Sequence, residues 1–228
     1  SRVAKLLGIP ELKQELSRSY SAGVTANFGK LKVTADAYYI RIDDRVVYTG
    51  NFTGSNASSA TAQDKEIYDL LRQANASSAR FFANAIDTET KGLDLVLTYN
   101  EQIGRGTLRT DLSGTFVKTN ILGAVKSSAQ LAGKEDIYFD QSSRIYLESA
   151  VPRTKVNLSF NYSLDRFNVF LRNVYFGAVD GATNVDADKQ VFGAKVITDL
   201  SVGYGLSKNL RLTVGANNLL DIYPDETR

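Results

Sequence analysis

The sequence predicts an all-β protein, an antiparallel β-barrel that crosses a membrane. Apolar and polar residues alternate with a period of two over four pairs of stretches, the signature of strands with two different faces. The connection within each pair is short, whereas the connections between pairs are long. Strict alternation of short periplasmic turns and long extracellular loops, with strands of about ten residues or more, is typical of transmembrane barrels.

The first predicted hairpin joins residues 20–28 to residues 31–39 across Gly29-Lys30. Glycine at the first central position suits a two-residue hairpin turn. Closing the chain at that turn places Tyr20 opposite Tyr39. One face of the hairpin is then wholly apolar, and the other carries polar side chains.

The other three predicted pairs repeat this pattern, each with one apolar and one polar parity. They join 93–99 to 108–116 through 100–106, 156–162 to 167–175 through 163–166, and 196–206 to 210–216 through 207–209.

Three long segments, 49–83, 119–150 and 177–194, separate the pairs and are rich in Ser, Ala, Asn, Asp and Gly. Loops of this length are unusual inside a compact soluble domain. The first contains apolar residues at helical spacing behind Asp64, which predicts a short helix with Asp64 as N-cap that packs on its own loop. These residues are Ile67, Leu70, Leu71 and Ala74.

Aromatic residues recur at both ends of the apolar parity. Phe28, Tyr99, Tyr162, Phe167 and Tyr204 lie near the short turns, and Tyr39, Phe116 and Tyr175 lie about nine residues farther along. At about 3.3 Å per residue and a tilt of about 40°, nine residues climb about 23 Å, close to the spacing of the two aromatic girdles of a membrane barrel.

A soluble sandwich or barrel around a closed core is the alternative, because alternation alone does not distinguish lipid from a protein interior. The girdle spacing and the long loops favour the membrane. Four residues on the expected lipid face count against it: Thr110, Gly114, Asn173 and Thr198.

The composition argues against catalysis and against nucleic acid as a partner. The chain has no Cys and no His, so the usual general base, the commonest metal ligand and the thiolate nucleophile are missing. Its 27 basic and 25 acidic residues give a net charge of +2 and no strong field. No apolar run approaches the roughly 18 residues of a membrane helix. A β-rich hydrolase would need an acid–base pair without histidine.

Five stretches in this order resemble the C-terminal part of the barrel of TonB-dependent outer-membrane receptors. They are LKQE at 12–15, AYYIRIDDR at 37–45, ETKGLD at 89–94, VPRTK at 151–155 and GANNLLD at 215–221. Each is weak alone, but together they are fairly specific and span nearly the whole chain apart from the long loops.

The resemblance implies a partial barrel, about eight strands of the roughly 22 found in such plugged transporters. Residues 1–228 are then the C-terminal barrel segment of a larger receptor, with the plug domain and the final strand absent. The start at Ser1 and the lack of Met agree with a piece of a longer protein.

The family function implied is uptake of a scarce large nutrient, such as a ferric siderophore, cobalamin or a glycan, energised through TonB in the complete protein. The implied location is the bacterial outer membrane. The implied partners are outer-membrane lipid, the remaining strands and plug, TonB and an extracellular ligand, with no cofactor.

Three short motifs have a possible chemistry and a simpler interpretation. Asp180, Asn184, Asp186 and Asp188 are spaced like calcium ligands, but the run lacks the Gly and distal Glu of an EF-hand loop, which favours a solvated loop. Asp43-Asp44, between two arginines, is better explained as charge at the outer end of a strand than as an acid–base pair. Gly104-Arg105-Gly106 predicts a turn and not a phosphate site.

These interpretations leave the chain with no catalytic, metal or cofactor-binding residue and an unresolved substrate site. We expect ligand binding to use the long outer loops, and the charged residues of the inward parity to contact the plug or water. Those inward residues are Lys32, Asp36, Asp94, Arg109, Asp111, Lys155, Arg172, Asp199 and Arg211.

Overall fold

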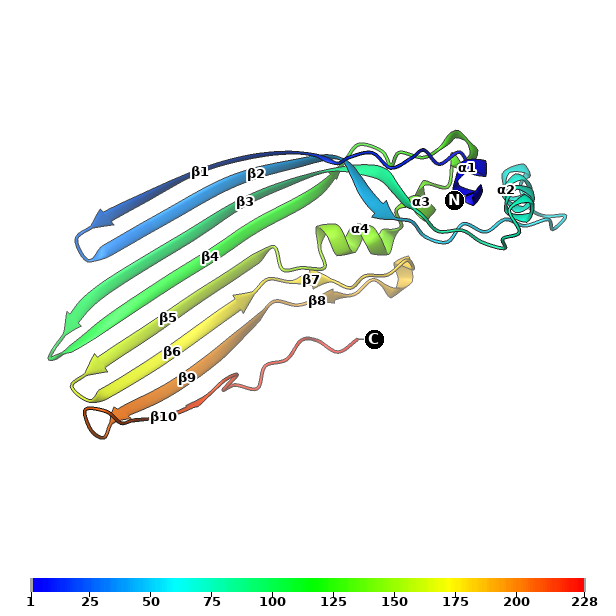
Figure 1. Ribbon diagram of the computed structural model, residues 1–228. Helices are drawn as coiled ribbons and strands as arrows, with labels where there is room; N and C mark the ends of the chain where they lie inside the picture. Colours follow the sequence, from blue (N-terminus) through cyan, green and yellow to red (C-terminus); the bar gives the residue numbers. More distant parts are fainter. Residues whose placement is uncertain (1, 228) are drawn as a thin grey trace.

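In the computed structural model, which describes residues 2–227, the chain forms one eight-stranded antiparallel sheet (Figure 1). The strand order is β1-β2-β3-β4-β5-β6-β9-β10, and β7 and β8 pair separately. The strands of the large sheet are β1 (Leu16–Phe28), β2 (Leu31–Tyr48), β3 (Phe82–Ile103), β4 (Gly106–Leu122), β5 (Thr154–Leu164), β6 (Phe167–Phe176), β9 (Lys195–Gly205) and β10 (Arg211–Ala216).

The predicted hairpins and their register are confirmed. Tyr20 pairs with Tyr39, and the rings stack with centroids 6.4 Å apart. Gly29 has a φ of +61°, a left-handed value that glycine adopts without a steric penalty. Two turns are shorter than predicted, because β3 and β4 continue to Ile103 and Gly106, and β5 continues to Leu164.

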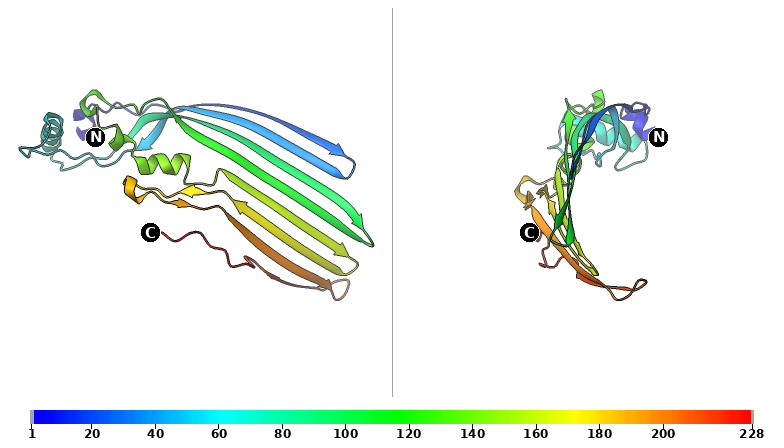
Figure 2. Two further views of the ribbon diagram at one scale, coloured as in Figure 1. Left: turned by 180° about the vertical axis from the view of Figure 1, so that it is seen from behind. Right: turned by 90° about the vertical axis from the view of Figure 1, so that its left-hand side faces the viewer.

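The sheet is open and curved (Figure 2). The short turns lie at one end of the sheet, and the helices and long loops all lie at the other (Figure 1). Strands β1 and β10 form its two edges, and within residues 2–227 neither has a second neighbouring strand.

One face of this sheet is apolar and is not covered by any other described element. Val33, Leu97, Leu112 and Leu158 form one row of cross-strand neighbours on this face. The row continues through Asn173 and Thr198, whose side chains hydrogen-bond to each other at 2.8 Å. Two of the polar residues that counted against a lipid-facing side therefore form a hydrogen bond with each other, which lowers the cost of placing them on that side.

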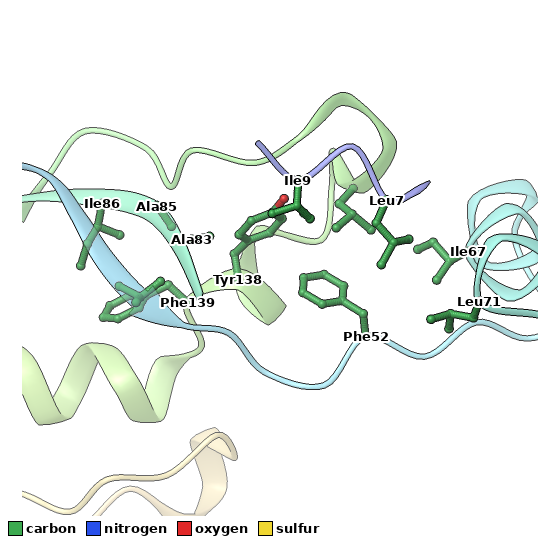
Figure 3. Close-up of a cluster of buried hydrophobic side chains, with 12 residues drawn as sticks. Leu7, Ile9, Phe52, Ile67, Leu71, Ala83, Ala85, Ile86, Tyr138 and Phe139 are labelled. Carbon is green, nitrogen blue, oxygen red and sulfur yellow. The ribbon is translucent and has the colours of Figure 1, made fainter. Parts of the chain in front are cut away.

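The buried core lies in the loops and not against the sheet. A loop cap, formed by residues 2–9, 49–81 and 123–139 with the adjoining ends of β2 and β3, encloses a hydrophobic cluster (Figure 3). Phe52 is fully buried, and its ring centroid lies 5.1 Å from Phe81 and 5.3 Å from Tyr138. The cluster consists of Leu7, Ile9, Val47, Phe52, Ile67, Leu71, Ala83, Ala85, Ile86, Leu131, Tyr138 and Phe139.

The predicted helix is present as α2 (Ala62–Gln73), and it buries Ile67 and Leu71 on its own loop. The N-cap is Thr61, not Asp64 as expected. Thr61 Oγ1 accepts a hydrogen bond from the Asp64 N–H at 3.1 Å and donates one to the Asp64 carboxylate at 2.7 Å. A threonine three residues before an acidic residue forms this reciprocal capping arrangement, which moves the helix start three residues earlier.

Several short elements were not predicted, because they are too short to show a period. They are α1 (Arg2–Leu6), η1 (Ala129–Leu131), α3 (Glu135–Tyr138), α4 (Gln141–Glu148), β7 (Val179–Asp180), η2 (Asp186–Asp188) and β8 (Val191–Phe192). Across residues 2–227, every helix is too short or too polar to span a membrane.

Candidate functional site

The polar face of the sheet carries ion pairs, one within strand β4 and one between β6 and β9. Arg109 Nε lies 2.7 Å from Asp111 Oδ2, and Thr98 donates to the same carboxylate at 2.7 Å from the neighbouring strand. On β6 and β9, Arg172 Nε lies 2.9 Å from Asp199 Oδ2. These four predicted inward charges therefore neutralise one another in pairs.

Asp199 also anchors the segment that follows β10. The Asn218 N–H donates to Asp199 Oδ1 at 2.8 Å, and Leu219 N–H donates to Thr198 O at 2.7 Å. Asn218 has a φ of +49°, and its side chain closes the bend by bonding both the N–H and the carbonyl of Ile222 at 3.0 Å. Asparagine tolerates this left-handed conformation and can bond nearby backbone. The motif at 215–221 is thus a bend fastened to β9.

A cavity of about 430 Å³ lies at the loop end, beside the N-terminus of α4. Asp140 accepts hydrogen bonds from Ser143 N–H at 2.7 Å and from Asn184 Nδ2 at 3.0 Å. Asn184 Oδ1 in turn accepts from Ser142 N–H at 2.7 Å. The third long loop is therefore tied to α4, and the cavity beside them is lined by residues of all three long loops.

A second cavity, of about 480 Å³, lies on the polar face beside Asp199. Asn157 Oδ1 is buried there and has no hydrogen-bond partner within residues 2–227. Lys155 Nζ lies 5.0 Å from the centroid of the Phe176 ring. The cavity thus presents the Lys155 cation, and the unpartnered Asn157 oxygen lies buried in its wall. Its polar lining is Lys155, Asn157, Arg172, Asp199, Asn217 and Asn218.

Asp36 and Asp94 are a pair of directly opposed carboxylates on the polar face. Neither makes an ion pair with another described residue. Like charges directly opposite each other destabilise a sheet. This position therefore favours a cationic group supplied from outside the sheet.

The residues spaced like calcium ligands do not converge. Asn184 and Asp186 each accept a hydrogen bond from the start of α4, from Ser142 at 2.7 Å and Gln141 at 3.2 Å, and Asp186 also pairs with Lys189 at 2.8 Å. In the described part of the chain, no three acidic side chains gather closely enough to hold a metal ion.

Asp43 and Asp44 are held in separate ion pairs and do not form an acid–base pair. Asp43 lies 2.9 Å from Arg18 and 2.8 Å from Arg41. Asp44, at a φ of +56° beside an irregularity in the β2–β3 register, lies 2.7 Å from Lys126 Nζ. The prediction of charge at the end of a strand is wrong in position, because β2 continues to Tyr48 and both residues lie beside the irregularity inside it.

Acid should loosen the loop end before it affects the sheet. Hydrogen bonds from Lys134 and Thr61 hold the pKa of Asp64 below its ordinary value, and the Gly133 N–H lowers the pKa of Glu135. Burial alone would raise the pKa of Asp140, but hydrogen bonds from Ser143 and Asn184 outweigh it and the pKa is lowered.

A carboxyl group with a lowered pKa stabilises the fold fully above its unfolded pKa of about 4, and this contribution is lost as the pH falls through the folded pKa. We therefore expect the amide protection factors of residues 61–73 and 133–149 to fall below about pH 4, and those of β1–β6, which are held by the backbone ladder, to fall less. Asp140→Asn should remove part of this pH dependence near α4. An equal fall in sheet and loops would contradict the expectation.

An open, curved antiparallel sheet with one apolar face, one polar face and all long loops at one end is a segment of a transmembrane β-barrel. The model of the TonB dependent receptor-like β-barrel family matches residues 3–219, and the chain belongs to this family. A comparison with curated protein sequences finds no match.

Solved structures of similar fold are outer-membrane receptors and transporters. The copper transporter OprC is 15% identical with a TM-score of 0.59, and the match covers 95% of this chain and 28% of OprC. The outer membrane transporter YddB from Escherichia coli is 12% identical with a TM-score of 0.60, covering 94% and 30%. The ferric yersiniabactin uptake receptor FyuA from Yersinia pestis is 15% identical with a TM-score of 0.57, covering 91% and 25%. The chain spans less than a third of each.

Proposed function

We propose that this chain is part of the wall of an outer-membrane receptor that takes up a scarce large nutrient and is energised through TonB in the complete protein. The observation that carries the proposal is the open eight-stranded sheet with an uncovered apolar face. Lipid cannot satisfy the free N–H and C=O groups at β1 and β10, so further strands of the same receptor cover both edges.

The two faces and two ends of the sheet have different surroundings in this proposal. The apolar face contacts outer-membrane lipid, and the polar face contacts the plug or water. The short turns face the periplasm, and the loop cap faces the outside, where the ligand arrives. The two cavities, one between loops and one on the polar face, lie along the route that a ligand would take.

The nutrient class follows from the family and its structural relatives. Two of those relatives are a copper transporter and a ferric yersiniabactin uptake receptor. A ferric siderophore, cobalamin or a glycan is the class we propose for the complete receptor. Members of this family are transporters and not enzymes, and the separate ion pairs of Asp43 and Asp44 give the hydrolase alternative no support.

The soluble alternative requires a core that covers the apolar parity. Tyr20, Val24 and Val214 on that parity are 65%, 62% and 69% exposed. Strands β1 and β10 lie at opposite edges and do not pair with each other, as a small closed barrel would require. These observations favour the membrane segment.

Uptake by cells that express the complete receptor tests the proposed function. Labelled ferric chelates, cobalamin and oligosaccharides are the probes, each with and without TonB. We expect accumulation of one probe that requires both the receptor and TonB. Accumulation that continues without TonB would overturn the energised mechanism, and accumulation of no probe would overturn the nutrient class.

The opposed carboxylates provide a test of plug contact. In the complete receptor, Asp36→Asn with Asp94→Asn should destabilise the seated plug by about 1–3 kcal/mol, the usual contribution of hydrogen bonds to charged groups. Amide exchange of the plug measures the change. Asp165→Asn, at an exposed turn where the side chain pairs with Arg105, is the control and should leave the plug unaffected. A plug stabilised by the double substitution would show that no cation lies between the two carboxylates.

A further inference from the structure

Two lysines face each other on the apolar side of the sheet, at its loop end. Lys91 and Lys118 are directly opposed across β3 and β4, and both are exposed. Their parity is that of Leu93 and Phe116, so they share the face that carries the apolar rows. Directly opposed like charges cost stability unless an anion lies between them.

The protein itself supplies a negative counter-charge to only one of the two lysines. Lys91 Nζ lies 3.0 Å from Glu89, whereas the Lys118 side chain makes no ion pair or hydrogen bond with another residue in 2–227. Glu89 itself is shared, because it also accepts a hydrogen bond from Asn120 at 3.2 Å. One cation of the pair is therefore left without a counter-charge.

The neighbouring row adds positive charge. Arg18 and Arg41 are cross-strand neighbours one step nearer the loops on the same face, and both contact Asp43. Arg18, Arg41 and Lys91 each lie beside a carboxylate, Asp43 or Glu89, and Asp87 lies on the same parity but is shared with Lys126. The four cations of the two rows therefore exceed the nearby carboxylates by at least one positive charge, and Lys118 is the cation without a partner.

The lysine pair lies level with an aromatic girdle. Tyr20, Tyr39, Lys91 and Lys118 form one continuous cross-strand row, and the Lys91 ammonium lies 5.7 Å from the centroid of the Tyr39 ring. Tyrosine at the membrane–water interface marks the level of the lipid headgroups. Lysines at this level extend their charged ends toward the headgroups while their stems contact apolar surface.

We propose that Lys91 and Lys118 bind the phosphate of an anionic lipid headgroup in the leaflet on the loop side. We infer a lipid headgroup for three reasons. The positive charge is in excess, the two lysines lie at the level of the headgroups, and Lys118 has no counter-charge on the apolar face. The phosphate lies between the two ammonium groups, and the acyl chains lie along the apolar rows below them. This inference rests on the membrane orientation proposed above.

Native mass spectrometry of the complete, delipidated receptor in neutral detergent tests the site, with phosphatidic acid and phosphatidylcholine as probes. Each lysine near a phosphate should contribute about fivefold in affinity, so the pair should favour phosphatidic acid by about 25-fold. Lys91→Gln with Lys118→Gln should abolish this preference. Lys91→Arg with Lys118→Arg, which keeps both charges, should retain it.

Lys32→Gln with Lys208→Gln is the matched control, because it removes the same charge from the polar face and from the turn between β9 and β10. It should retain the preference for phosphatidic acid. Loss of the preference in this control, or its survival in the Lys91/Lys118 glutamine variant, would overturn the site. Displacement of phosphatidic acid by an equal concentration of inorganic phosphate would show a site for free phosphate and not for lipid.

Insertion of the same receptor into phosphatidylcholine vesicles shows whether a negative result concerns the phosphate site or the proposed function. A receptor that inserts but shows no lipid preference overturns the phosphate site alone. A receptor that fails to insert overturns the membrane orientation itself.

Discussion

Arginine in place of Leu171 should cost the folded receptor about 2–4 kcal/mol in a bilayer, because it places a charge on the lipid side near the midplane. Leu171 lies midway between Phe167 and Tyr175 on β6, and its cross-strand neighbours Phe160 and Leu200 are apolar. The free energy of unfolding from lipid vesicles in denaturant measures the effect. Val33→Arg on β2 should behave similarly.

Thr34→Arg is the control for this substitution. Thr34 is adjacent to Val33 but lies on the polar face, where its hydroxyl is 3.1 Å from that of Thr25. We expect its cost to be below about 1 kcal/mol, the range near a wet surface. Equal costs on the two parities would show that neither face contacts lipid.

Replacing Phe52 with alanine should destabilise the loop cap by about 3–5 kcal/mol, the usual loss when a buried aromatic ring is removed. Phe52 joins the segments 49–81 and 123–139 of the cap, because it is fully buried between Phe81 and Tyr138 and its backbone pairs with Ala79. The sheet should remain folded away from the loop ends of β2 and β3, because the only strand residues in the cluster are Val47, Ala83, Ala85 and Ile86. Amide exchange of α2 and α3 should accelerate by two orders of magnitude or more.

Phe82→Ala is the matched control. Phe82 is 57% exposed and lies next to the cap, with its ring against Tyr48 at 4.9 Å. Its loss should change exchange in the cap by less than tenfold. Slow exchange in α2 after Phe52→Ala would mean that the loops are ordered without the hydrophobic cluster.

Most of the sheet could be predicted from the sequence, and the pairing of Tyr20 with Tyr39 shows why. A period of two assigns each side chain to a face, and a two-residue turn sets the register of the hairpin. Once Gly29-Lys30 is recognised as the turn, every opposite pair in β1 and β2 follows. The same reasoning located the other hairpins, with errors of a few residues at the turns.

Less of the candidate site could be predicted. Arg172 and Asp199 were placed on the correct face, but their pairing depends on β6 lying beside β9, across an 18-residue segment with no period. The contact of Asn184 with Asp140 joins two different loops, so the calcium-like spacing around it was misleading. The capping role of Thr61 had a recognisable signal, a threonine three residues before an acid.

The alternation of residue types was therefore sufficient to set the strands, the two faces and the hairpin registers, because each depends on neighbours close in the chain. The membrane class needed the aromatic spacing and the long loops as well. The folded loop cap, the tie between α4 and the third loop, the cavities and the opposed pairs Asp36–Asp94 and Lys91–Lys118 depend on the tertiary structure. They form between segments separated by irregular chain, where no period specifies a partner and only the packed structure decides which groups meet.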